Sequence, residues 1–239
     1  MGSILESTLW GKTALRLLLQ CNELDSQHPA IMHMRHTERI ASFKGSDGNY
    51  ASTSIGKEAA AEFGSTLPKD REYRLFHTYV DRTRETAEEI RHGIVGSGGR
   101  AELCGKISSN PTLDREAFLR WIQSRKWFPE DGSYNHTCQW IAGLMPDKIQ
   151  EPSMDFAQVL AEIMMSNLHG ASLNAYHIYV SHDMWIQAML FHWFGVPPQP
   201  GGLRFLDGFL MQPLDGGIRA WFGGHCDLYD YPPWWPKAA

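Results

Sequence analysis

The sequence predicts a three-layer α/β/α fold, in which helices cover both faces of a mainly parallel central sheet. Short apolar runs of strand length alternate with helical segments along the chain, and the clearest pair is Tyr176–Val180 followed by Met184–Phe194. Such alternation requires crossover connections and therefore favours parallel strands. The chain has 239 residues and no internal repeat or low-complexity tract, so we expect one domain over residues 1–239.

The first half of the chain supplies two strands and two helices. Each strand is a short apolar run that ends in polar residues, and each helix has small or apolar residues at helical spacing. A loop rich in glycine, serine, aspartate and asparagine covers Gly45–Ser54. In chain order, the elements are strand Pro29–Met34, helix Ile55–Phe63, strand Tyr73–Val80 and helix Arg82–His92.

The middle of the chain is expected to be a helical insertion at about residues 96–170. Gly93–Gly105 is glycine-rich and predicts irregular structure. Helices are expected at Leu113–Trp127 and Met154–Leu168. Two further strands are expected around Phe209 and Ala220, before an aromatic tail.

Composition excludes several classes of protein. The 22 basic and 27 acidic side chains give a net charge of −5, which argues against a nucleic-acid-binding protein. No apolar stretch reaches the roughly 18 to 20 residues of a membrane helix. The N-terminal apolar patch Ala14–Leu19 contains Arg16 and has no small-residue cleavage site, so we expect no signal peptide. The four cysteines are scattered, which favours reduced thiols and a cytoplasmic location.

Two histidines follow predicted strand ends, where sites form in open α/β sheets. His36 stands between Arg35 and Arg39, and His182 follows the strand that ends at Val180. Nearby positive charge lowers the pKa of a histidine and leaves a ring nitrogen free to attack phosphorus, while arginines hold phosphoryl oxygens. The alternative for the first cluster is a histidine beside arginines that make ordinary surface ion pairs.

Each of the other residues also has an ordinary structural interpretation. Asp183 or Ser181 can cap the helix that follows, and Arg82 can be a solvated charge on a polar helix. His33 and His36 suggest a metal site, but side chains three residues apart on a strand point to opposite faces. We therefore expect no metal and no other cofactor.

Four segments, in order, resemble the histidine phosphatase superfamily, also called phosphoglycerate mutase-like. Arg35-His36-Thr37 is similar to its Arg-His-Gly signature, and Thr53–Gly64 to its Thr-x-x-Gly-x-x-Gln-Ala-x-x-Leu-Gly segment. Arg82–Ala87 matches its Arg-x-x-x-Thr-Ala helix start, and Val180–Asp183 resembles the segment of its second histidine. The resemblance extends from about residue 30 to 190, without the insertion.

The resemblance implies phosphoryl transfer in two steps through a phosphohistidine, with His36 as the nucleophile. It implies a phosphate pocket made by Arg35, Arg39, Arg82 and His182. In the acid-phosphatase branch, the aspartate of a His-Asp pair protonates the leaving group. The resemblance thus offers two candidate proton donors. They are Asp183 by that branch, and Glu102 by the mutase-like branch, where a glutamate follows the Arg82 helix.

These observations predict a metal-independent phosphatase acting on a small phosphomonoester. A phosphomutase or phosphotransferase is the first alternative, but the mutase signature has Trp-Asn where this chain has Arg39-Ile40. A non-catalytic phosphate-binding domain is the second, since Thr37 and Ala41 depart from the family pattern. A metal-dependent hydrolase is the third. Selectivity for the substrate is expected to lie in the insertion.

The C-terminal tail is rich in aromatic residues interleaved with prolines. Tyr229, Tyr231, Trp234 and Trp235 are expected to pack on the domain, because aromatic side chains dominate cores. The alternatives are contact with another subunit, which would make the protein a homo-oligomer, and a platform for a sugar or an apolar group.

Overall fold

The computed structural model of the chain describes residues 2–40, 51–108, 114, 116–117, 120 and 132–235. These residues form a seven-stranded sheet in the order β3-β2-β4-β1-β5-β6-β7. Four neighbouring strands are parallel: β1 (Ala30–Arg35), β2 (Glu72–His77), β3 (Arg100–Lys106) and β4 (Ala175–Ser181). The sheet continues with the antiparallel strands β5 (Gly208–Leu214), β6 (Gly217–Phe222) and β7 (His225–Tyr229).

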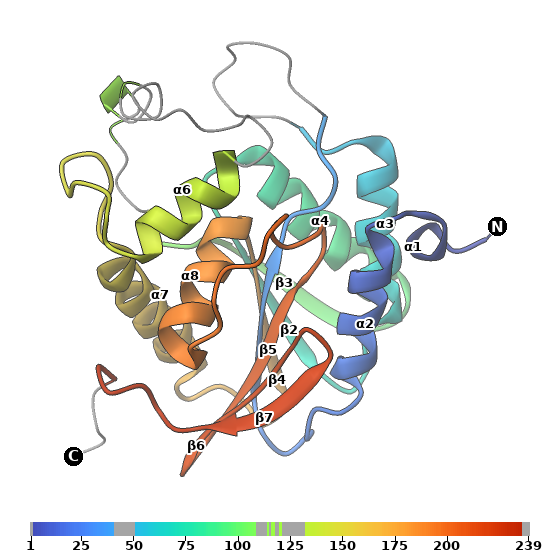
Figure 1. Cartoon of the computed structure of the whole chain (residues 1–239). Helices are drawn as coiled ribbons and strands as arrows, with labels where there is room; N and C mark the ends of the chain where they lie inside the picture. Colours follow the sequence, from blue (N-terminus) through green and yellow to red (C-terminus); the bar gives the residue numbers. More distant parts are fainter. Residues whose placement is uncertain are drawn as a thin grey trace.

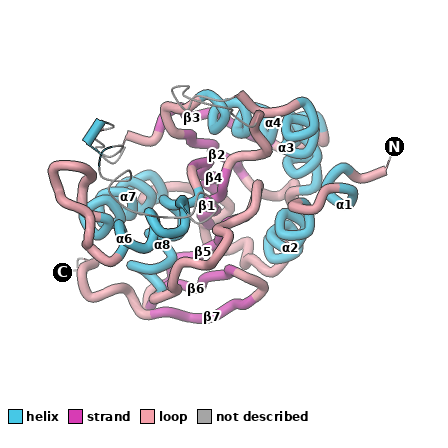
Figure 2. Tube along the Cα trace, turned by 45° about the horizontal axis from the view of Figure 1, so that its top comes forward, coloured by secondary structure: helices cyan, strands magenta, loops and turns pink. Residues whose placement is uncertain are grey.

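Helices cover both faces of the sheet, as Figures 1 and 2 show, so the prediction of a three-layer α/β fold is confirmed. One helical layer contains α1 (Ile4–Ser7), α2 (Gly11–Cys21), α3 (Ser54–Thr66) and α4 (Asp81–Gly96). The other contains α6 (Gly132–Ile141), α7 (Ser153–Leu168) and α8 (Asp183–Phe194).

The central strands are buried on both faces, which explains why the sequence marks them as continuous apolar runs. Alternate side chains of a strand point to opposite faces. In β1, Ile31 faces the α6–α8 layer, whereas Met32 and Met34 face the α1–α4 layer. In β4, Tyr179 faces the α6–α8 layer and Ile178 faces the α1–α4 layer. The two strands thus hold both cores together.

The close approach of α3 and α4 depends on glycine. A Cβ atom built on Gly64 would overlap the carbonyl oxygen of Ile90, and one on Gly93 would overlap that of Ala61. The two helices therefore pack backbone against backbone. This contact fixes α4 relative to α3, which matters for the site described below.

The expectation of irregular structure over Gly93–Gly105 was wrong. Helix α4 runs to Gly96, and β3 occupies Arg100–Lys106 and pairs with β2. β3 is an edge strand whose residues are exposed or only half-buried. An edge strand has one neighbour and needs no continuous apolar run, so its pattern is weak in the sequence.

Residues 96–170, predicted as a helical insertion, contribute to the sheet and to one of its two helical layers. Its first part contributes the strand β3, and α6 and α7 form one covering layer of the sheet together with α8. Phe156 and Leu160 of α7 are fully buried in that layer. The predicted loop Gly45–Ser54 and helix Leu113–Trp127 lie mostly outside the described residues.

The aromatic tail packs on the domain, as predicted. Trp234 and Trp235 each have a ring centroid 6.0 Å from that of Trp193 on α8. The indole Nε1 of Trp234 donates to the carbonyl oxygen of His192 at 3.1 Å, and Tyr231 stacks on Trp235. Among the described residues, no helix combines the length and apolar character that crossing a membrane requires.

The α3–α4 contact gives the first prediction. Gly64→Ala is expected to lower the free energy of unfolding by about 1–3 kcal/mol, because the added methyl group cannot fit against the backbone of Ile90. Gly96→Ala, at the end of α4, is the matched control, since no atom lies within 4 Å of its Cβ position. Urea denaturation of both variants checks this. Equal destabilisation by the two substitutions would contradict it.

Candidate active site

The ends of β1 and β4 bring His36 and His182 together. The two strands are parallel, with Arg35 opposite Ser181, so the residues that follow them lie side by side. The backbone N–H of His36 donates to the carbonyl oxygen of Ser181 at 3.1 Å. The two imidazole centroids are 5.8 Å apart, and the ring planes meet at 68°. Both predicted histidines therefore belong to one site.

Arg82, in the first turn of α4, connects the two imidazoles. Its Nε donates to Nε2 of His36 at 2.9 Å. Its Nη2 lies 3.3 Å from Nδ1 of His182. A guanidinium group can only donate hydrogen bonds, so each of these ring nitrogens offers a lone pair.

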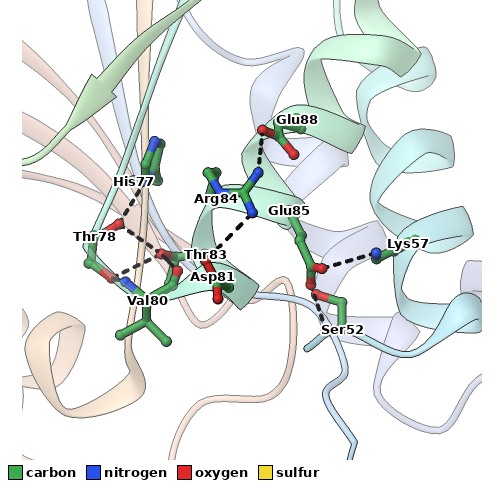
Figure 3. A network of polar contacts seen from close by, with 10 residues as sticks. All are labelled: Ser52, Lys57, His77, Thr78, Val80, Asp81, Thr83, Arg84, Glu85 and Glu88. Atoms are coloured by element: carbon green, nitrogen blue, oxygen red, sulfur yellow. Dashed lines mark hydrogen bonds and ion pairs between the residues drawn. The ribbon is translucent and has the colours of Figure 1, made fainter. Parts of the chain in front are cut away.

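The start of α4 is held in place by Glu85, one turn after Arg82. Its carboxylate accepts from the backbone N–H of Ser52 at 2.7 Å and from Nζ of Lys57 at 3.1 Å (Figure 3). Lys57 belongs to α3. These contacts and the α3–α4 packing place the guanidinium of Arg82 without any ligand.

The hydrogen bonds of His36 define its tautomer. Its Nδ1 lies 2.7 Å from the carbonyl oxygen of Thr37, which can only accept, so Nδ1 carries the hydrogen. Nε2, opposite, accepts from Arg82. Burial, then the charges of Arg82 and His182, lower the pKa of His36 well below its usual value. The ring is neutral at pH 7, with Nε2 as its basic atom.

His182 has the opposite tautomer. Because Nδ1 accepts from Arg82, Nε2 carries the hydrogen and donates to Oγ1 of Thr78 at 3.1 Å. Thr78 Oγ1 lies 2.9 Å from Oγ1 of Thr83, whose own hydroxyl donates to the carbonyl oxygen of Val80 at 2.7 Å (Figure 3). Burial, followed by nearby arginine charge, lowers the pKa of His182 to about 3.

Thr37 uses its side chain away from the two imidazoles. Its hydroxyl donates to the carbonyl oxygen of Gly56 at 2.8 Å, and its backbone N–H donates to Oγ1 of Thr86 at 3.1 Å. Thr37 is fully buried. The residue thus ties the segment after His36 to α3 and α4.

Arg35 and Asp183 lie beside the site but contact the loop between α8 and β5. Arg35 Nη1 donates to the carbonyl oxygen of Leu203. Asp183 Oδ1 accepts from the backbone N–H of Leu203 at 2.9 Å and from Gln187 at 2.8 Å. Asp183 Oδ2 is 3.9 Å from Arg35 Nη1. Burial raises the pKa of Asp183.

The structure does not bring Glu102 to this site. Glu102 lies on the edge strand β3, opposite Arg74, three residues before the end of β2. It is exposed and forms an ion pair with Arg74 at 3.7 Å. The residues that follow it to Ser108 include no acid.

Arg39 lies on the segment after His36. It forms an isolated antiparallel β-bridge with Ser52, and its Nη1 lies 3.5 Å from the carbonyl oxygen of Ile40.

Two neighbours of the histidines were not found from the sequence. Thr78 directly follows β2, so its place at a third strand end was a signal that could have found it. Phe205 has its ring centroid 5.8 Å from that of His36. It lies on the loop before β5, and nothing in the local pattern indicates that this loop folds back to β1.

Two hollows lie away from the histidines. A cavity of about 460 Å³ is at the amino ends of β2 and β3, and one of about 410 Å³ lies between the loop before β5 and the β6–β7 turn. Within the described parts of the chain, no three His, Cys, Asp or Glu side chains are grouped as metal ligands.

Comparison with solved structures identifies the fold. The structure of YhfR from Bacillus stearothermophilus aligns with a TM-score of 0.56 at 16% identity, over 82% of this chain and 96% of that one. A phosphoglycerate mutase from Bacillus anthracis aligns with a TM-score of 0.53 at 14% identity, over 87% of this chain and 94% of that one. No family model and no curated protein matches the sequence. The chain has the phosphoglycerate mutase-like fold, as its motifs predicted.

Two more histidines are buried in the strands below the site. His33 Nε2 lies 2.6 Å from Oγ of Ser181, and neither ring nitrogen of His177 has a hydrogen-bond partner among the described residues. Burial lowers the pKa of His33 to about 3 and, with a smaller effect of Arg74, that of His177 to about 4. Below about pH 6.5 these two histidines therefore bind more protons in the unfolded chain than in the folded chain.

The second prediction follows from this difference in proton binding. The free energy of unfolding is expected to fall as pH decreases from 6.5 towards 4, by up to about 1.4 kcal/mol per pH unit for each such histidine. His177→Leu should make that slope shallower by about this amount, whereas His225→Ala, at an exposed position, should not. Burial raises the pKa of Asp183 and Asp207, which opposes the loss of stability at low pH. This contribution is the same in every variant, so it cancels when their slopes are compared. Urea denaturation from pH 7.5 to 4.5 measures the slopes, and identical slopes would refute the prediction.

Proposed function

We propose that the chain is a phosphatase that hydrolyses a small phosphomonoester through a phosphohistidine on His36. The observation that supports this best is the guanidinium of Arg82, shared between Nε2 of His36 and Nδ1 of His182. A neutral imidazole with a lone pair is a nucleophile for phosphorus. A fixed cation beside it stabilises the charge on the equatorial oxygens in the transition state.

The proposed first step transfers the phosphoryl group to His36. Phosphoryl oxygens accept the N–H groups of Arg82, and this releases the Nε2 lone pair. Nε2 then attacks phosphorus, the ester P–O bond breaks, and the leaving oxygen takes a proton. Nδ1 keeps its hydrogen and its hydrogen bond to the carbonyl oxygen of Thr37, which holds Nε2 in position to attack phosphorus. In this proposal the charges of Arg35 and Arg39 complete the phosphate pocket, and His182 lines it with its Nδ1 lone pair held by Arg82.

The second step restores the free enzyme. A water molecule attacks the phosphorus of the phosphohistidine, its proton goes to the carboxylate that served as the acid, and the P–N bond breaks with its electron pair on Nε2. The products are inorganic phosphate and neutral His36. Fixed arginine charge makes this sequence possible without a metal ion.

Asp183 is the proposed proton donor. Its Oδ1 is occupied by Leu203 and Gln187, so in this proposal the proton is carried by Oδ2, which lies 3.9 Å from Nη1 of Arg35. The pKa of Asp183 is raised by burial, which favours the protonated acid that the first step needs. Glu102, the other candidate, lies on the edge strand in an ion pair with Arg74.

The third prediction tests the nucleophile. His36→Ala is expected to abolish hydrolysis of p-nitrophenyl phosphate, and Arg82→Ala to slow it by tens to hundreds of times, because a charge-assisted hydrogen bond contributes about 1.5–3 kcal/mol. Wild-type protein should give an acid-labile, base-stable phosphoenzyme that His36→Ala lacks. His225→Ala, an exposed histidine on β7, is the matched control and should keep full activity.

Other outcomes of these assays would point to the alternatives. Retained turnover by His36→Ala would overturn the assignment of the nucleophile. Activity lost in EDTA and insensitive to vanadate would indicate a metal-dependent hydrolase. Transfer of the phosphoryl group to an added alcohol in preference to water would indicate a mutase or transferase. Phosphate binding without turnover of any ester in a metabolite panel would indicate a binding domain.

The fourth prediction tests the proton donor. Asp183→Asn is expected to slow hydrolysis of alkyl phosphates by about a hundredfold or more, but that of p-nitrophenyl phosphate much less, since nitrophenolate leaves without a proton. The acidic and basic limbs of the pH profile for an alkyl phosphate should change with the substitution. An equal loss for both substrates would show that Asp183 positions the Leu203 loop and does not donate the proton.

A further inference from the structure

Phe205 is an aromatic neighbour of His36 that the proposed chemistry does not use. Its ring centroid is 5.8 Å from that of His36, with 42° between the ring planes. Phe205 lies on the loop between α8 and β5 and is half-buried. The other groups in contact with the His36 ring, Arg82 and His182, are polar. An apolar ring therefore stands directly beside the proposed nucleophile.

Polar contacts hold this ring in place. The guanidinium carbon of Arg35 lies 4.7 Å from the Phe205 ring centroid, and Arg35 also donates to the carbonyl oxygen of Leu203. The backbone N–H of Leu203 donates to Asp183 at 2.9 Å. Leu203 stands two residues before Phe205, and both its carbonyl oxygen and its N–H are hydrogen-bonded. These bonds anchor the loop, so the position of the Phe205 ring is set before any ligand binds.

Trp10 extends the aromatic surface from a distant part of the chain. Its ring meets Phe205 edge to face, with centroids 5.8 Å apart and planes at 88°. The indole Nε1 donates to Oε1 of Glu38 at 3.3 Å, and Oε2 of Glu38 accepts from Thr53 at 2.8 Å. Trp10 is half-buried too. The one polar atom of the Trp10 side chain is thus paired with Glu38, and the rest of its ring is apolar.

We infer that Phe205 and Trp10 form a subsite for the leaving group, and that the substrate is an aryl phosphomonoester. The inference rests on the proposed function, because in-line attack puts phosphorus between Nε2 of His36 and the ester oxygen, and these rings then flank the leaving group. Aromatic rings pair favourably at centroid distances of about 4.5–7 Å, beyond the gain from burying their area. The indole N–H is already paired with Glu38, so the surface that Phe205 and Trp10 offer to the leaving group is that of their apolar rings.

The fifth prediction uses phosphonates, which bind without being hydrolysed. Titration calorimetry of wild-type protein should show phenylphosphonate binding about tenfold more tightly than methylphosphonate. Phe205→Ala should reduce this ratio to about threefold or less, with the Kd of methylphosphonate changed less than about twofold. Phe205→Leu, which keeps apolar volume, should give an intermediate ratio. Phe191→Ala, a 37% exposed ring on α8, is the matched control and should keep the wild-type ratio.

The outcomes separate this inference from the proposed function. Equal binding of both phosphonates to wild-type protein would overturn the aryl subsite and leave the anion site intact. Binding of neither would overturn the anion site itself. If Phe205→Ala weakened both phosphonates equally, Phe205 would only position the loop, and the inference would fail. The ratio of kcat/KM for phenyl phosphate to that for ethyl phosphate should fall in Phe205→Ala by the same factor as the binding ratio.

Discussion

The site depends on one interaction, the contact of a permanent cation with two neutral imidazoles, of which His36 is buried and His182 half-buried. The guanidinium of Arg82 donates to His36 and lies within hydrogen-bond distance of His182, so neither ring can take a proton without placing two positive charges side by side. Burial acts in the same direction on the pKa of both rings. In the proposed function, a tetrahedral anion is the ligand that accepts N–H groups of Arg82 in place of Nε2 of His36.

The fold makes this contact from three parallel strand ends. β1 leads into His36, β4 into His182, and β2 leads through Thr78 into the helix that carries Arg82. The sequence predicted these strands because central parallel strands are buried on both faces and appear as apolar runs. It did not predict β3, whose edge position leaves its residues exposed or half-buried, nor α1. The apolar residues of α2 were noted only as the patch Ala14–Leu19.

The parts of the site that the sequence predicted are those that local position determines. His36, His182 and Arg82 each stand at or just after a strand end, and the structure brings them together. Arg35 and Asp183 were also placed at strand ends, but the direction of their side chains is decided by a loop, through Leu203, that lies 20 residues after Asp183 and 168 after Arg35. Such a contact has no periodic or compositional signal. Phe205, on the same loop, escaped prediction for the same reason.

Thr37 shows how a departure from a motif can leave a site intact. A side chain at this position, where the family signature has glycine, was a reason to consider a non-catalytic domain. In the structure its hydroxyl is bonded to the carbonyl oxygen of Gly56, and that carbonyl is accessible only because α3 begins very close to the segment after His36. A Cβ atom on Gly56 would lie 2.6 Å from the carbonyl oxygen of Glu38 and 3.1 Å from Oγ1 of Thr37. Glycine is therefore needed at position 56, in the first turn of α3. The space beside Nε2 of His36 stays open to the guanidinium of Arg82.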